Sequence, residues 1–114
     1  MSYVTDYLDL MQHVLSHLRQ HRGEVLRISS HLTRVANQYI ETDCATVQFE
    51  FVYDIAELDA TGNKLMVMGH KELFEVFCDR ICHLELKDGD IHINEELGGV
   101  FRQNVLRVYP RSAA

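Results

Sequence analysis

The segment TVQFEFVYDI at residues 46–55 constrains the fold more than any other part of this chain. Apolar side chains occupy every second position, at Val47, Phe49, Phe51, Tyr53 and Ile55. Successive side chains of a β-strand point to opposite faces of its sheet, so this alternation predicts a strand with one buried face. The turn-forming residues DATGN follow at 59–63, and a second strand is expected at 64–69. We therefore expect a long hairpin in this part of the chain.

The two segments before this strand have a helical period instead. Between residues 3 and 21 the apolar side chains recur every three or four positions, at Tyr7, Leu10, Met11, Val14, Leu15 and Leu18. Between residues 24 and 40 the same spacing is found at Val25, Ile28, Leu32, Val35 and Tyr39. Gly23 separates the two segments and is typical of a helix C-terminus. The sequence therefore predicts two N-terminal helices.

A second hairpin is expected around KDGD at residues 87–90, because Asp-Gly favours a two-residue turn. If Asp88 and Gly89 form the loop, the register pairs Lys87 with Asp90, Leu86 with Ile91, Glu85 with His92, Leu84 with Ile93, and His83 with Asn94. Residues 70–78 fit either a helix or a strand, and their central aromatic and β-branched side chains favour a strand. A last strand is expected at 100–109, before Pro110.

These elements predict an α+β fold for one domain spanning residues 1–114. Residues 1–40 would be helical, and residues 46–110 would form an antiparallel meander. The apolar stripes of two helices must be buried against the apolar face of the sheet. We therefore expect a two-layer structure, with two N-terminal helices packed on a four- to five-stranded antiparallel sheet.

Charge and cysteine content limit the partners and the compartment. The chain carries 11 Lys and Arg against 17 Asp and Glu, a formal net charge of −6, so no nucleic-acid partner is expected. No apolar stretch approaches the roughly 20 residues of a membrane span, and no membrane partner is expected either. The three cysteines form no C-x2-C pair, which indicates a reduced, cytoplasmic protein. Without a phosphate-binding loop, a dinucleotide fingerprint or a nucleophile motif, we expect no cofactor.

Three histidines recur at intervals of four residues in the first predicted helix, at His13, His17 and His21. Two histidines with this spacing can chelate one transition-metal ion, although a structural zinc site needs about four ligands. Helical-wheel geometry places His13 toward solvent and His21 nearest to the apolar stripe. The alternatives are a metal-responsive site, an interface that titrates near neutral pH, and an ordinary helix margin.

A second candidate site lies on the predicted Asp88-Gly89 hairpin, where His83, Glu85 and His92 share one face. A carboxylate beside an imidazole can orient a general base, and the alternative is a surface ion pair. If this face lines a cavity, the chain is a small acid–base enzyme. That architecture resembles the cone-shaped nuclear-transport-factor-2-like class. The resemblance is one of element order, covers no motif, and departs where that class inserts a helix after its first strand.

A third candidate is a sheet face that is less polar than a solvent-exposed face should be. We assign Val52, Met66, Met68 and Tyr53 as candidate binding residues, because methionines adapt to varied partners at binding surfaces. The alternative is that a bulge swaps the two faces and makes the outer residues core. The function we expect first is therefore a small cytosolic binding or regulatory module. It would form a homodimer and recognise a protein or small ligand through its sheet face.

Overall fold

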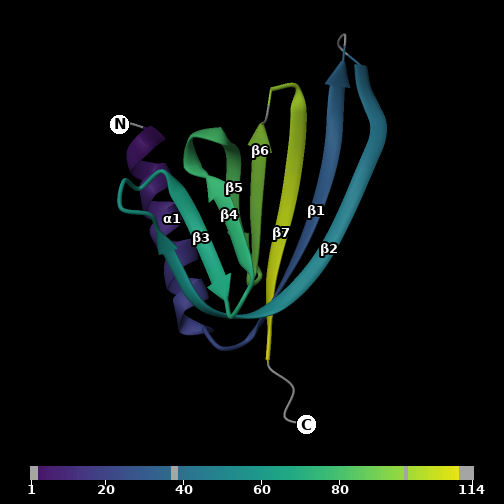
Figure 1. The fold of residues 1–114 in the computed structure, drawn as a ribbon. Helices are drawn as coiled ribbons and strands as arrows, with labels where there is room; N and C mark the ends of the chain where they lie inside the picture. Colours follow the sequence, from purple (N-terminus) through teal and green to yellow (C-terminus); the bar gives the residue numbers. More distant parts are fainter. Residues whose placement is uncertain (1–2, 37–38, 97, 111–114) are drawn as a thin grey trace.

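The computed structural model describes residues 3–36, 39–96 and 98–110, and within them the chain forms one α-helix and seven strands (Figure 1). The helix is α1 (Tyr3–Gln20). The strands are β1 (Val25–Ala36), β2 (Tyr39–Leu58), β3 (Lys64–Gly69), β4 (Leu73–Phe77), β5 (Ile81–Lys87), β6 (Asp90–Glu96) and β7 (Val100–Tyr109). A short 3-10 helix, η1 (Cys78–Arg80), joins β4 to β5.

All strand pairs are antiparallel, and the sheet order is β4-β3-β2-β1-β7-β6-β5. The 20-residue strand β2 pairs with β1 over its first part and with β3 over its last part. Figure 1 shows β2 sweeping in a wide curve, so that β3 and β4 lie over the other part of the sheet. The helix α1 contacts β5 and β2 and therefore covers the side where the bent sheet stays open.

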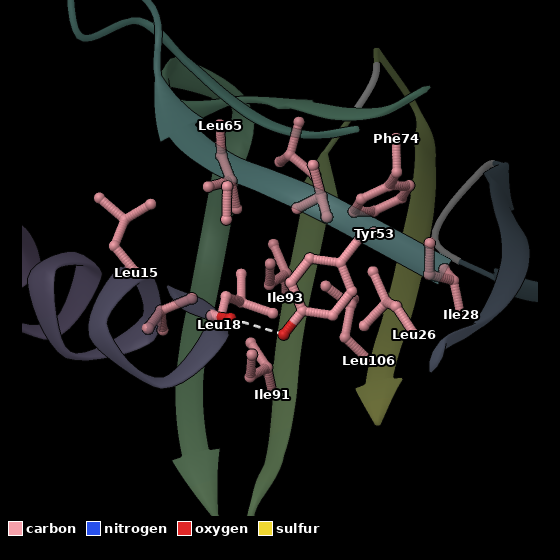
Figure 2. Close-up of a cluster of buried hydrophobic side chains, with 14 of the residues drawn as sticks. Leu15, Leu18, Leu26, Ile28, Tyr53, Leu65, Phe74, Ile91, Ile93 and Leu106 are labelled. Carbon is pink, nitrogen blue, oxygen red and sulfur yellow. Dashed lines mark hydrogen bonds between the residues drawn. The ribbon is translucent and has the colours of Figure 1, made fainter. Parts of the chain in front are cut away.

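The core fills the space between these two parts of the sheet and α1. Figure 2 shows side chains from β2, β3 and β4 pointing toward Ile91 and Ile93 of β6 and Leu106 of β7. Tyr53 lies at the centre, and its hydroxyl donates a 2.5 Å hydrogen bond to the Leu18 carbonyl of α1. This bond satisfies the polar end of a buried ring, and burial raises the pKa of Tyr53.

The second predicted helix, at residues 24–40, is wrong, because this segment contains β1, which lies between β2 and β7. Val25 and Ile28 suggested one helical face, but their three-residue spacing places them on opposite faces of a strand. The inward positions of β1 include the buried Ser30, whose hydroxyl donates a 2.6 Å hydrogen bond to Asn104 Oδ1. This inward polar residue interrupts the apolar alternation that identifies a strand.

The predicted four- to five-stranded meander, and with it the two-helix α+β description, is wrong as well. In the part of the chain that the structure describes, most residues belong to one sheet, with seven strands in an order that departs from a simple meander. β4 and β5 follow one another in the chain but form the two edges of the sheet, and β1 instead joins β2 to β7. A strand central to the sheet was thus assigned to the helical layer.

The local predictions for both hairpins are confirmed. The β2–β3 hairpin forms over the 59–63 turn, and residues 73–77 of the ambiguous segment are a strand. In the β5–β6 hairpin all five predicted pairs occur, from Lys87 with Asp90 to His83 with Asn94. Asp88 and Gly89 have φ angles of 54° and 81°, as a two-residue primed turn requires. Within the described residues, no helix is long and apolar enough to cross a membrane.

Candidate functional site

The three histidines at intervals of four residues, His13, His17 and His21, have different surroundings. His13 Nε2 lies 3.7 Å from Asp9 Oδ2, and 66% of the His13 side chain is exposed. The rings of His17 and His21 lie together, with their centroids 4.9 Å apart. Among the residues that the structure describes, no three His, Cys, Asp or Glu side chains are grouped so that they could hold a metal ion. The geometry therefore gives no support to a metal-responsive ladder.

His17 and His21 instead line a cleft of about 480 Å³ where the end of α1 meets the β5–β6 turn and the end of β7. The remaining lining residues are Glu24, Asp88, Gly89, Asp90, Arg107, Val108 and Pro110. This volume falls within the range of small-molecule sites, and the lining comes from segments far apart in the sequence. We call this feature the α1 cleft.

One wall of the α1 cleft is formed by the histidine pair and Glu24. His21 Nδ1 lies 3.0 Å from Glu24 Oε2, and the two residues form a hydrogen bond in the turn between α1 and β1. Burial lowers the pKa of His17, and the charge of His21 lowers it further, while a hydrogen bond to the Gly89 backbone and the charge of Glu24 act in the opposite direction. At neutral pH the His17 ring is therefore an uncharged polar group at the edge of the cleft.

A forked ion pair between β6 and β7 also lines the cleft. Arg107 Nε donates a 2.7 Å hydrogen bond to Asp90 Oδ1, and Arg107 Nη2 donates to Asp90 Oδ2. The bonded guanidinium lowers the pKa of Asp90. Because the Arg107 guanidinium and the Asp90 carboxylate neutralise each other, the pair contributes little net charge to the cleft.

The predicted acid–base group lies on the sheet face that points away from the core. Glu85 faces His92 across the β5–β6 pair, and His83 Nε2 lies 3.7 Å from Glu85 Oε1. About half of the His83 and Glu85 side chains is exposed. The arrangement is that of a solvent-exposed cross-strand ion pair, which contributes little to stability and does not enclose a substrate.

The predicted binding face divides between the core and the surface. Tyr53 is fully buried, whereas Val52, Met66 and Met68 are half-buried on the outer face. A bulge at Asp54 changes the register of β2 between Tyr53 and Ile55. The bulge swaps the faces of β2 beyond it, but Val52, Met66 and Met68 do not become core as the alternative interpretation expected.

The bulge creates an outer apolar patch that the alternation alone does not predict. Ala56 is now inside with 6% exposure, and Ile55 is outside with 46% exposure. Ile55 pairs with Met68, and Met68 pairs with Leu73, whose exposure is 53%. We define the outer apolar patch as Ile55, Met66, Met68 and Leu73. It extends to β4, the edge strand of the sheet.

Two polar groups were missed by the sequence analysis. Glu95 is only 1% exposed, forms an ion pair with Arg102, and accepts a 3.0 Å hydrogen bond from Asn104 Nδ2. Because Ser30 also bonds Asn104, this buried network joins β6, β7 and β1. Among the described residues every buried polar side-chain atom has a partner, so the network is a structural element rather than an open site.

The other group that was not predicted is a row of charged side chains on the outer face of β2, β1, β7 and β6. Arg27 and Arg107 are register partners, Arg27 Nε donates a 3.1 Å hydrogen bond to Glu50 Oε2, and Arg107 binds Asp90. The Arg27 guanidinium lies 4.7 Å from the centroid of the Tyr109 ring. The sequence analysis does not predict this group of charges, because it places Arg27 in the second predicted helix.

Comparisons with known proteins give a fold but no activity. No protein-family model matches the sequence, and no curated protein matches it. The crystal structure of the Bacillus subtilis YojF protein is similar, with a TM-score of 0.61 over 90% of this chain and 93% of that chain. The sequence identity is 10%, so the similarity concerns the fold alone. This chain therefore shares the architecture of YojF, and its function has to be argued from its own surfaces.

Proposed function

We propose that the protein is a small cytosolic binding module that forms a homodimer through the outer apolar patch and the adjoining edge strand β4. The observation that carries this proposal is the continuous row from Ile55 through Met68 to Leu73, which is exposed and ends at an edge of the sheet. Contiguous exposed apolar surface on a folded protein typically marks an interaction site.

The energetic argument concerns the apolar area left in water. Fully burying a Leu or Ile side chain contributes about 1.5–3 kcal/mol, so exposing half of one forgoes about 1 kcal/mol. Ile55 and Leu73 are each exposed by about half. Pairing of the β4 edges would cover Leu73 on both copies of a symmetric dimer, and this burial would supply a part of the free energy of association.

The open side of β4 offers the backbone groups that a partner strand needs. β4 pairs with β3 on one side and ends the sheet on the other. Unpaired edge strands are templates for pairing with another chain. In antiparallel pairing of two β4 strands about a two-fold axis at Glu75, Leu73 of each copy would lie opposite Phe77 of the other.

Charge is compatible with this symmetric pairing. The two Glu75 carboxylates would face each other at the axis, which by itself is unfavourable. Lys64 Nζ lies 3.2 Å from Glu75 Oε2 in each copy and offsets that repulsion. The Phe77 ring is 41% exposed, and the cationic groups of Lys64 and Arg80 lie 5.5 Å and 5.2 Å from its centroid.

The test is light scattering coupled to gel filtration, at low and high protein concentration. We expect the wild type to be a dimer at high concentration and Leu73→Asp to be a monomer with an unchanged circular dichroism spectrum. Val47→Asp is the matched control, because Val47 is 50% exposed but lies on the opposite face of β2. A wild type that stays monomeric, or a dimer that is lost in Val47→Asp and kept in Leu73→Asp, would refute the proposal.

A further inference from the structure

A second hollow, of about 300 Å³, lies on the outer face of the sheet where β2, β1 and β7 run side by side. Its lining residues are Arg27, Ser29, Gln48, Val105, Arg107 and Tyr109. Among the described residues that line it, two carry a guanidinium and none carries a carboxylate, although the chain as a whole has a formal net charge of −6. We call this feature the arginine pocket. It shares no residue with the outer apolar patch and is independent of the proposed dimer.

The two guanidinium groups of the pocket come from directly opposed positions of the sheet. Arg27 pairs with Glu50 on one side and with Arg107 on the other. Arg107 in turn binds Asp90, so the charges along this row run negative, positive, positive, negative. Like charges directly opposite each other on neighbouring strands are unfavourable. The row therefore has an excess of positive charge at its centre, between β1 and β7.

The group that lies between the two arginines is the hydroxyl of Tyr109. Arg27 Nη1 donates a 3.3 Å hydrogen bond to it, and the Arg27 guanidinium lies over the Tyr109 ring. The pKa of Arg107 is raised, first by its bond to Asp90 and then by a hydrogen bond to the same Tyr109 hydroxyl. One neutral oxygen thus serves two cations, and it offsets their repulsion much less than an anion would.

The existing ion pairs leave part of each guanidinium available. Arg27 donates through Nε and Nη1, and Arg107 donates to its carboxylate through Nε and Nη2. Within the described part of the chain, Arg27 Nη2 and Arg107 Nη1 bind no carboxylate. The Arg27 side chain is 40% exposed and that of Arg107 is 51% exposed, so a ligand can reach both from solvent.

We infer that the arginine pocket binds a phosphate dianion, either free or as the monoester of a small molecule. A carboxylate has two oxygens and is matched by a single guanidinium, as Asp90 is by Arg107. A phosphate group has at least three acceptor oxygens and up to two negative charges, so it can accept hydrogen bonds from both guanidinium groups at once. The Ser29 hydroxyl and the Gln48 amide line the same pocket and are further donors.

The experiment is an NMR titration of backbone amides with inorganic phosphate at about pH 7.5, where the dianion predominates. Sodium chloride keeps the ionic strength constant, so that screening does not change during the titration. We expect saturable shifts at the amides of Ser29, Gln48 and Val105, and much weaker binding of acetate, a carboxylate. Phosphate shifts that never saturate, or acetate that binds as tightly as phosphate, would overturn the inference.

A second titration, with glycerol phosphate, separates the two sources of the dianion. Binding tighter than that of inorganic phosphate, with shifts that extend to Tyr109, would assign the pocket to a phosphorylated small molecule. Weaker binding at the same amides would assign it to free phosphate. Shifts confined to amides outside the pocket would refute both assignments.

Arginine variants separate the pocket from the general charge of the chain. Arg27→Gln and Arg107→Gln should each weaken phosphate binding by about two- to fivefold, the effect of one exposed ionic contact. Arg22→Gln is the matched control, because Arg22 is exposed and lies outside the pocket. It should bind phosphate as the wild type does. Equal weakening in all three variants would mean that only net charge attracts the anion.

Glu50→Gln tests whether the present ion pair competes with the ligand. It should strengthen phosphate binding by about two- to fivefold, because it releases the Arg27 guanidinium from its carboxylate. Glu57→Gln removes the same charge from an exposed position of β2 outside the pocket and should have no effect. Equal strengthening in both variants, or weaker binding in Glu50→Gln, would contradict the inference. Because oligomeric state is measured separately, failure of this pocket and failure of the proposed dimer are distinguishable.

Discussion

The outer face of the sheet differs between its middle strands, β1 and β7, and the strands that lead to the β4 edge. On β1 and β7, Arg27 has Glu50 as its carboxylate partner and Arg107 has Asp90. On β2, β3 and β4, the row through Met68 is apolar and exposed at both ends. The first region has polar groups suited to water, whereas the second leaves apolar area uncovered. This contrast is the basis for proposing the second region as the interface.

The sharpest way to test this contrast uses adjacent residues of β3. Leu65 is fully buried, and Leu65→Ala should lower the free energy of unfolding by about 2–5 kcal/mol, the usual cost of a cavity. Met66 points outward, and Met66→Ala should cost the monomer less than about 1 kcal/mol. Urea unfolding of both variants, in monomeric protein, measures the difference. Similar costs would mean that the outer face of β3 is packed as tightly as the inner face.

The ion pair of Asp90 and Arg107 should have a smaller effect on the free energy of unfolding, and this effect depends on pH. Asp90 has a lowered pKa in the folded state, so the unfolded chain takes up its proton first as the pH falls. The pair with Arg107 therefore stabilises the fold fully above the ordinary carboxyl pKa of 3.8, and this contribution is lost as the pH falls below that value. Asp90→Asn should remove this part of the acid sensitivity.

Arg107→Gln provides the control for that pH dependence. It should flatten the acid part of the stability curve as Asp90→Asn does, and the double variant should show no further flattening. The measurement is the urea midpoint of each variant across the acid range. An acid sensitivity that survives in all three variants would show that other groups determine it.

The features that follow from neighbouring residues could be predicted from the sequence. Asp88-Gly89 determines a turn, and the turn determines every pair of the β5–β6 hairpin. The helix α1 was predicted for the same reason, because an apolar stripe with a 3.6-residue period needs no distant information. The positions of His13 and His21 relative to the core also follow from this period.

The features that depend on distant residues could not be predicted. Ser30 points inward because it alternates with Ile28 along β1, and its buried hydroxyl is satisfied by Asn104 of β7, a partner that nothing near Ser30 in the sequence reveals. The bulge at Asp54 reverses Ile55 and Ala56, although the alternation continues through it. The arginine pocket likewise joins Arg27 to Arg107 through the fold. Both proposed sites therefore required the three-dimensional structure.

The most direct test of the proposed interface is amide hydrogen exchange in β4, measured by NMR at low and high protein concentration. The dimer predicts that amides of Leu73–Phe77 on the open side of β4 exchange more slowly at high concentration, because they then bind a second strand. Amides in the first part of β2, near Val47, should not change. Fast, concentration-independent exchange along β4 in a protein that nevertheless dimerises would contradict the proposed interface.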